Sequence, residues 1–249
     1  IKKLVSRAKE LNMSSIAITD HGCMFGVIDF YKTAKKEGIK PIIGCEVYTA
    51  PRTLRDKDPN YDKRQGHLVL LAKNMDGYKN LIKIVSTSYV EGFYYKPRVD
   101  MDELRKYSDG IIALSACLAG DVSQALMDRN YDKAKKLALE YRDIFGEENY
   151  YLEIQDHNLP EQREVNSGLV KLSKETGIQL VATNDIHYVN KEDSKIHDVL
   201  MCIQMGKMVN DPNRMRFGSD EFYLKSREEM EELFPYAIDA VENTVKIAE

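Results

Sequence analysis

The sequence predicts an α/β fold built on a largely parallel sheet. Short apolar stretches alternate with amphipathic ones along most of the 249 residues. Gly38 and Gly177 stand where amphipathic stretches end, as glycine commonly does at helix C-termini. Polar residues also collect just after the apolar stretches. Strands that alternate with helices in this way are typical of βα units, whose strands run parallel.

The elements can be assigned in chain order. Apolar stretches predict strands at residues 15–19, 41–48, 68–72, 110–115, 150–155 and 179–183. Amphipathic stretches predict helices at residues 2–11, 26–37, 78–90, 121–127, 131–145 and 160–176. After about Lys191 helical patterns predominate, and Ser226 with Glu229 has the spacing of a capping box. His67 precedes its strand instead of following it, so we expect that strand to run antiparallel.

Composition limits the class of protein. The net charge of −4 argues against a chain that binds nucleic acid by its overall charge. No run of 18 apolar residues and no signal peptide is visible, so no membrane association is expected. The four cysteines, Cys23, Cys45, Cys117 and Cys202, lack CxxC spacing, which favours a reduced, cytoplasmic location.

Both ends of the chain lie inside helical patterns. The first residues, Ile1 to Val5, enter an amphipathic stretch without a capping residue, and Glu249 stops within another. We therefore expect a piece of a longer protein.

Metal-ligand residues cluster at the predicted strand ends, where parallel α/β folds carry their chemistry. These residues are Asp20 with His21, Glu46, Cys117, Asp156 with His157, and Asp185 with His187. Asp185 and His187 stand two apart, so on an extended segment they would point to the same side. Glu46 is a carboxylate in an otherwise apolar strand, and a buried carboxylate needs a partner.

Histidine, carboxylate and thiolate groups together suit Zn²⁺, Mn²⁺ or Fe²⁺. Several of each favour a multinuclear centre, the usual arrangement for phosphoester hydrolysis. Each candidate has a structural alternative: a strand-end turn for Asp185 and His187, a core residue for His21 or Cys117, and a surface loop for His67. Asp20 is a candidate to orient a ligand imidazole. His157 and His197 are weaker candidates, and the other cysteines are expected in the core.

Arg98 is the best candidate for a phosphate contact, because a guanidinium binds phosphate through two parallel hydrogen bonds. It lies in the aromatic segment FYYKPR at residues 93–98. These aromatics could stack on bases, although such residues more often serve in packing.

Three of these motifs resemble the polymerase-and-histidinol-phosphatase (PHP) domain family: ITDHG at 18–22 with the following MFG, IIGCEVY at 42–48, and HLVLLAKN at 67–74. FYYKPR at 93–98, LSACLAG at 114–120 and TNDIHY at 183–188 narrow the resemblance to the PHP domains of bacterial DNA polymerase III alpha subunits. The resemblance covers essentially the whole chain.

The resemblance implies a distorted, TIM-like (β/α)7 barrel that binds up to three metals at one mouth. Carried over by position, it implies His21, Glu46, His67, Cys117, Asp185 and His187 as metal ligands, with Arg98 and Asp20 as catalytic residues. The family's first strand carries a His-x-His motif that this chain lacks. We therefore expect a barrel without its first strand and with fewer bound metals. Residues 1–205 would form this domain, and residues 206–249 a helical connector toward a polymerase core.

The resemblance also implies a function. The domain would carry out metal-dependent 3′–5′ exonuclease or phosphoesterase proofreading with Zn²⁺ or Mn²⁺. The parent would be a DNA-directed DNA polymerase, a nucleotidyltransferase that uses Mg²⁺ in replication. Its partners would be DNA and other replicative subunits, including a proofreading exonuclease. The alternatives are a catalytically silent module that stabilises the polymerase and, less favoured, a stand-alone phosphatase of the histidinol-phosphate type.

Overall fold

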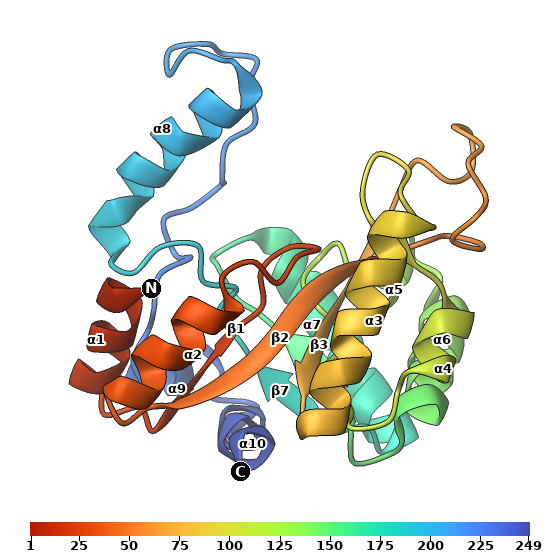
Figure 1. Ribbon diagram of the computed structural model, residues 1–249, viewed down its shortest axis with the longest axis horizontal. Helices are drawn as coiled ribbons and strands as arrows, with labels where there is room; N and C mark the ends of the chain where they lie inside the picture. Colours follow the sequence, from red (N-terminus) through yellow and green to blue (C-terminus); the bar gives the residue numbers. More distant parts are fainter.

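The computed structural model covers residues 1–249 and shows a curled sheet with helices outside it (Figure 1). The strands are β1 (Ser15–Ile18), β2 (Lys40–Thr49), β3 (Gly66–Ala72), β4 (Arg98–Val99), β5 (Ile111–Leu114), β6 (Tyr150–Ile154) and β7 (Leu180–Ala182). The helices are α1 (Lys2–Glu10), α2 (Val27–Lys36), α3 (Met75–Val90), α4 (Met101–Lys106), α5 (Asp121–Met127), α6 (Tyr131–Phe145), α7 (Pro160–Thr176), α8 (Ser194–Met205), α9 (Arg227–Leu233) and α10 (Ile238–Ala248).

The sheet has seven strands in the order β1-β2-β3-β5-β6-β7, with β4 paired to β2 outside this path. Strand β3 runs antiparallel to both neighbours, as the position of His67 predicted, and the remaining pairs are parallel. The outermost strands β1 and β7 are not paired with each other. The chain therefore forms a curled α/β half-barrel, in agreement with the expected barrel-like fold, but with seven strands and not the six that were expected.

Two short elements, β4 and α4, were not predicted from the sequence. Strand β4 has only two residues, too few for a recognisable alternation. Helix α4 has six residues and is capped by Asp100, whose carboxylate accepts a hydrogen bond of 3.0 Å from the Glu103 backbone N–H. Neither element is long enough for its hydrophobic pattern to repeat.

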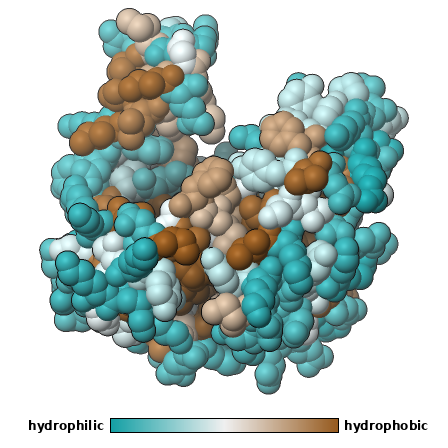
Figure 2. Space-filling view, in the orientation of Figure 1, coloured by the Kyte–Doolittle hydropathy of each residue, from teal (hydrophilic) through white to brown (hydrophobic).

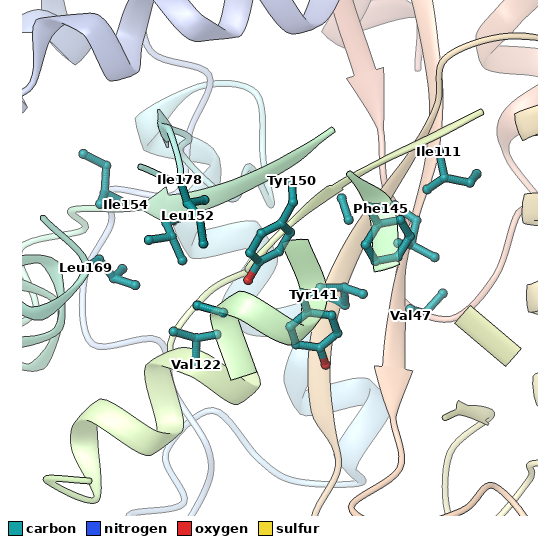
Figure 3. Close-up of a cluster of buried hydrophobic side chains, with 14 of the residues drawn as sticks. Val47, Ile111, Val122, Tyr141, Phe145, Tyr150, Leu152, Ile154, Leu169 and Ile178 are labelled. Atoms are coloured by element: carbon teal, nitrogen blue, oxygen red, sulfur yellow. The ribbon is translucent and has the colours of Figure 1, made fainter. Parts of the chain in front are cut away.

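The main core lies between the outer face of the sheet and helices α3 and α5–α7. Figure 3 shows part of it, where Tyr141 and Phe145 of α6 lie near Tyr150 and Leu152 of β6. The alternation along each strand decides which side chains face outward. On β3, for example, Leu68 and Leu70 join this outer core, while Val69 and Leu71 belong to a separate inner cluster.

The inner face of the sheet is apolar for part of its depth. Its cluster comprises Val69, Leu71, Ile112, Leu114, Ala116, Tyr151 and Val181, and Ile247 of α10 packs against it. By the same alternation, Glu46 and His67 share this inner face, because each stands an even number of residues from an inward-facing position. The curl of the sheet thus places the polar side chains of Glu46 and His67 next to the inner apolar cluster.

The segment expected as a connector is partly integrated into the domain. Phe234 and Val241 join the main core, and Leu224 joins the cluster beneath α1 and α2. The predicted capping box of Ser226 and Glu229 is present at the start of α9. The 205/206 boundary therefore does not coincide with the end of the packed domain. None of the helices combines the length and the apolar character that crossing a bilayer requires.

Helix α8 behaves differently, because it projects away from the sheet as an arm together with the loop that follows it (Figure 1). Several of its apolar side chains are exposed, Ile203 by 72%. A second projection, formed by residues 50–65 between β2 and β3, rises on the same side of the molecule.

Candidate metal centre

His21, Glu46 and His67 bring one ligand atom each to within 4.8 Å of one another. The parallel pairing of β1 with β2 continues past the end of β1 as a bridge between His21 and Glu46. The antiparallel pairing of β2 with β3 places His67 opposite Tyr48, two residues beyond Glu46 on the same face. The strand register therefore assembles this group from three separate parts of the chain.

Glu46 is the buried centre of the group. Its Oε1 lies 2.5 Å from His67 Nδ1, and its Oε2 lies 3.4 Å from His21 Nδ1. The side chain is only 7% exposed, and Oε1 has no well-aligned hydrogen-bond donor. Burial by itself would raise the pKa of Glu46, but the adjacent His67 and His21 imidazoles more than offset this and lower it. A buried anion between two imidazoles fits a divalent cation.

Cys117 lies beside this group, with Sγ 3.7 Å from His67 Nδ1. The turn that carries it is held against β3 by a hydrogen bond of 3.1 Å from the His67 backbone N–H to the Ala119 carbonyl. Gly120 closes this turn, and a Cβ there would lie 2.0 Å from the Ser115 carbonyl oxygen. Burial raises the pKa of the Cys117 thiol, so a metal would have to displace its proton.

Asp185 and His187 reach the same centre from the end of β7. The ring centroids of His187 and His21 are 6.0 Å apart, although their strands lie at opposite edges of the sheet. The expected extended geometry is wrong, because Asp185 has a φ of 41° and β7 ends at Ala182. His187 Nδ1 lies 2.8 Å from the Asp185 carbonyl oxygen, which fixes the ring and leaves Nε2 as the ligand atom. Burial raises the pKa of Asp185, with a smaller opposing effect from His187.

Asp20 does not play the expected orienting part. Its carboxylate forms no hydrogen bond with an imidazole, whereas its backbone carbonyl accepts one of 3.1 Å from the Glu46 N–H. The Cys45 thiol also donates to that carbonyl, at 3.3 Å. Asp20 thus helps to position Glu46 through its backbone, while burial raises the pKa of its own carboxyl.

The expected phosphate contact of Arg98 is also wrong in this structure. Its side chain is fully buried, and its guanidinium donates to the backbone carbonyls of Gly92, Leu54, Asp56 and Asp62 at 2.8–3.4 Å. A guanidinium whose donors are occupied in this way is not available to phosphate. Arg98 instead ties the loop of residues 50–65 to β4.

Glu153 is a buried carboxylate that sequence reasoning missed. It lies on the inner face of β6, is 5% exposed, and accepts hydrogen bonds from Thr183 Oγ1 and from Gln155 Nε2. Its Oε2 has no partner, and burial raises its pKa to about 7. The signal was available, because Leu152-Glu153-Ile154 places a glutamate in an apolar strand just as Cys45-Glu46-Val47 does.

The weaker candidates, His157 and His197, pack against other side chains of the domain. His157 is fully buried, stacks on Phe222 and lies within hydrogen-bond distance of the Asn184 carbonyl, at 2.8 Å, and of Gln162. Burial lowers the pKa of His157 to about 4. His197 of α8 packs near His187, with ring centroids 5.5 Å apart. Cys45 and Cys202 are buried, as expected, while Cys23 is half-buried.

The fold is a curled α/β half-barrel that carries a candidate metal-ligand group of two histidines and a glutamate at one mouth. The chain belongs to the PHP domain family, whose model matches residues 1–157. It is 50% identical over its whole length to the DNA polymerase III subunit alpha of Borreliella burgdorferi and 47% identical to that of Treponema pallidum. The chain spans only 22% and 21% of the length of these relatives.

Solved structures are more distant. A protein of Bifidobacterium adolescentis, described as a metal-dependent phosphoesterase, matches 96% of this chain and 91% of its own, with 14% identity and a TM-score of 0.45.

Proposed function

We propose that this chain is the PHP domain of a bacterial DNA polymerase III alpha subunit and supports metal-dependent phosphodiester hydrolysis, as a 3′–5′ exonuclease in proofreading. The observation that carries the proposal is the buried carboxylate of Glu46, whose two oxygens lie 2.5 Å from His67 Nδ1 and 3.4 Å from His21 Nδ1. A carboxylate and two imidazoles that converge in this way are ligands that a divalent cation such as Zn²⁺ takes in proteins.

The residues present fit such a cation, with Zn²⁺ or Mn²⁺ the metals that this donor set favours. Glu46, His21 and His67 would hold it, and Cys117, Asp185 and His187 would contribute further ligands around the same mouth. When bound, divalent metals neutralise phosphate oxygens and make water a stronger nucleophile. The His21 side chain is 44% exposed, so the mouth is open to a substrate from solution.

For the parent protein we propose DNA-directed DNA polymerase activity with Mg²⁺. Its proposed partners are DNA and the other subunits of a replicative assembly, including a proofreading exonuclease. These proposals rest on the names of the relatives, of which this chain spans about a fifth.

A second candidate is a structural module that stabilises the polymerase without hydrolysis of its own. The unpaired edges of β1 and β7 favour it, because they leave the half-barrel open beside the candidate metal ligands. In that case the cluster would bind metal weakly or in part.

The test compares metal content and hydrolysis in the same preparations. The wild-type chain, Glu46→Gln and a matched control, Glu103→Gln on α4, are each loaded with Zn²⁺ or Mn²⁺, dialysed and measured by mass spectrometry. Each is then assayed for shortening of a 5′-labelled oligodeoxynucleotide. We expect Glu46→Gln alone to lose both metal and hydrolysis. Bound metal without hydrolysis in the wild type would favour the structural module, and equal activity in Glu46→Gln would exclude this centre as the catalytic site.

A further inference from the structure

The loop of residues 50–65 stands directly beside the candidate metal centre. It leaves β2 after Thr49 and re-enters β3 at Gly66, which pair with each other next to the pair formed by Tyr48 and His67. Figure 1 shows this loop (orange) and the α8 arm projecting from the same side of the molecule, and Figure 2 shows a gap between the two projections. Any extended ligand that reaches the centre from this side passes the loop.

The loop is held in a defined shape despite its polar composition. Arg98 donates to the carbonyls of Leu54 and Asp56, as described above. The carboxylate of Asp100 accepts a hydrogen bond of 2.8 Å from the Leu54 N–H. Arg52 pairs with the fully buried Asp62, whose pKa falls to about 2 because of the hydrogen bond between them. The surface side chains of the loop are therefore presented in fixed positions.

A basic–aromatic strip, consisting of Tyr48, Lys96, Tyr95 and Lys63, connects this loop to the centre. The Tyr48 ring lies 5.1 Å from the His67 ring, and Lys96 Nζ lies 5.3 Å from the Tyr48 ring centroid. Lys63 Nζ lies 5.9 Å from the ring centroid of Tyr95, which is 58% exposed. Tyr48 is buried beside the metal centre, so Tyr95 is the ring of the strip that is exposed for stacking.

The charge of this region is positive, in contrast to the chain as a whole. Residues 50–65 include five basic and three acidic residues, whereas the net charge of the chain is −4. Arg52 pairs with Asp62 and Arg55 with Glu91, whereas Lys57, Lys63, Arg64 and Lys96 form no ion pair. The exposed cations of the loop and strip are therefore free to bind an anion.

We propose that the strip binds single-stranded DNA and leads a strand end to the metal centre. Proteins that bind single strands combine cations that follow the phosphates with aromatic rings on which bases stack. Lys96 is separated from His67 by the Tyr48 ring. It would make the phosphate contact that the sequence suggested for Arg98. The inference rests on the proposed function for the direction of the strand, but binding itself requires no hydrolysis.

The test measures binding in EDTA, where no metal-dependent cleavage occurs. The anisotropy of a fluorescent oligodeoxynucleotide is titrated with the 249-residue chain, with Lys63→Gln/Lys96→Gln, and with Tyr95→Ala. The matched control is Lys136→Gln/Lys174→Gln on α6 and α7, which removes the same charge elsewhere. We expect the strip lysine variant to bind about tenfold more weakly and to lower the slope of log K against log salt by about 1.4, or about 0.7 per lost phosphate contact.

Tyr95→Ala should weaken binding several-fold without changing this slope, because stacking is not ionic. Wild-type affinity in both strip variants, an equal loss in the control, or equal binding of duplex and single strands would overturn the proposal. If binding depends on the strip but the metal-loaded chain does not hydrolyse the oligonucleotide, the result would refute only the proposed exonuclease activity. If the strip variants hydrolyse the oligonucleotide with an unchanged KM, the result would refute only the proposal that the strip binds the DNA.

Discussion

Oε1 of Glu46 lies 2.5 Å from Nδ1 of His67, yet this buried oxygen has no well-aligned donor. The imidazoles of His67 and His21 favour the charged form of this carboxylate, and a divalent cation would bind the same three side chains. The relationship makes metal dependence of stability the first consequence to test.

Metal should stabilise the folded chain through Glu46. At a free Zn²⁺ or Mn²⁺ concentration 100 times the dissociation constant, the free energy of unfolding should rise by about 2.7 kcal/mol. Thermal unfolding with and without chelator measures this change. Glu46→Gln should remove the metal-dependent shift, whereas Glu103→Gln should retain it. A shift that survives in Glu46→Gln would place the metal elsewhere.

Replacing Arg98 should damage the loop of residues 50–65 and the fold, because the guanidinium satisfies four buried carbonyls. We expect Arg98→Met to lower the free energy of unfolding by about 2–4 kcal/mol in urea titration. Limited proteolysis should cut the loop faster in this variant. If the variant has normal stability but a raised KM for an oligonucleotide, the result would instead support the phosphate contact that the sequence predicted for Arg98.

Glu153 should make the metal-free chain less stable as pH rises. Its pKa is raised to about 7, above that of an unfolded glutamate, so the folded state retains its proton longer. The free energy of unfolding should be unaffected below about pH 4 and should fall between there and pH 7, by roughly 3 kcal/mol in total.

Urea titrations at pH 4.5 and 8 in EDTA measure this loss. Glu153→Gln, which keeps a neutral side chain of the same shape, should be more stable than wild type at pH 8 and similar at pH 4.5. The same pH dependence in both proteins would mean that Glu153 is ionised in the folded state.

The C-terminal residues should contribute to stability as part of the domain. Phe234 is fully buried in the main core, whereas Ile203 on α8 is 72% exposed. Phe234→Ala should therefore lower the free energy of unfolding by about 3–5 kcal/mol, whereas Ile203→Ala should change it by no more than about 0.5 kcal/mol. A small effect of Phe234→Ala would support the connector that the sequence suggested for residues 206–249.

The sequence alone determined the elements and most members of the centre. The long strands and helices begin and end close to their predicted residues, because each carries a full hydrophobic period and local end signals such as Gly177. Glu46 and His67 were identifiable because polar residues stand out in or beside an apolar strand. The elements β4 and α4 are too short for their hydrophobic pattern to repeat, so the sequence offers no comparable signal there.

Only the tertiary structure decided what these side chains contact. Asp185 and His187 reach the centre through a turn and the curl of the sheet, which join residues far apart in sequence. Arg98 was expected at the surface, but pairing of β4 with β2 buries it under the loop, where carbonyls occupy its donors. A residue's chemistry can be read from its type, whereas its partners depend on strand register and burial, which arise only when the whole chain packs.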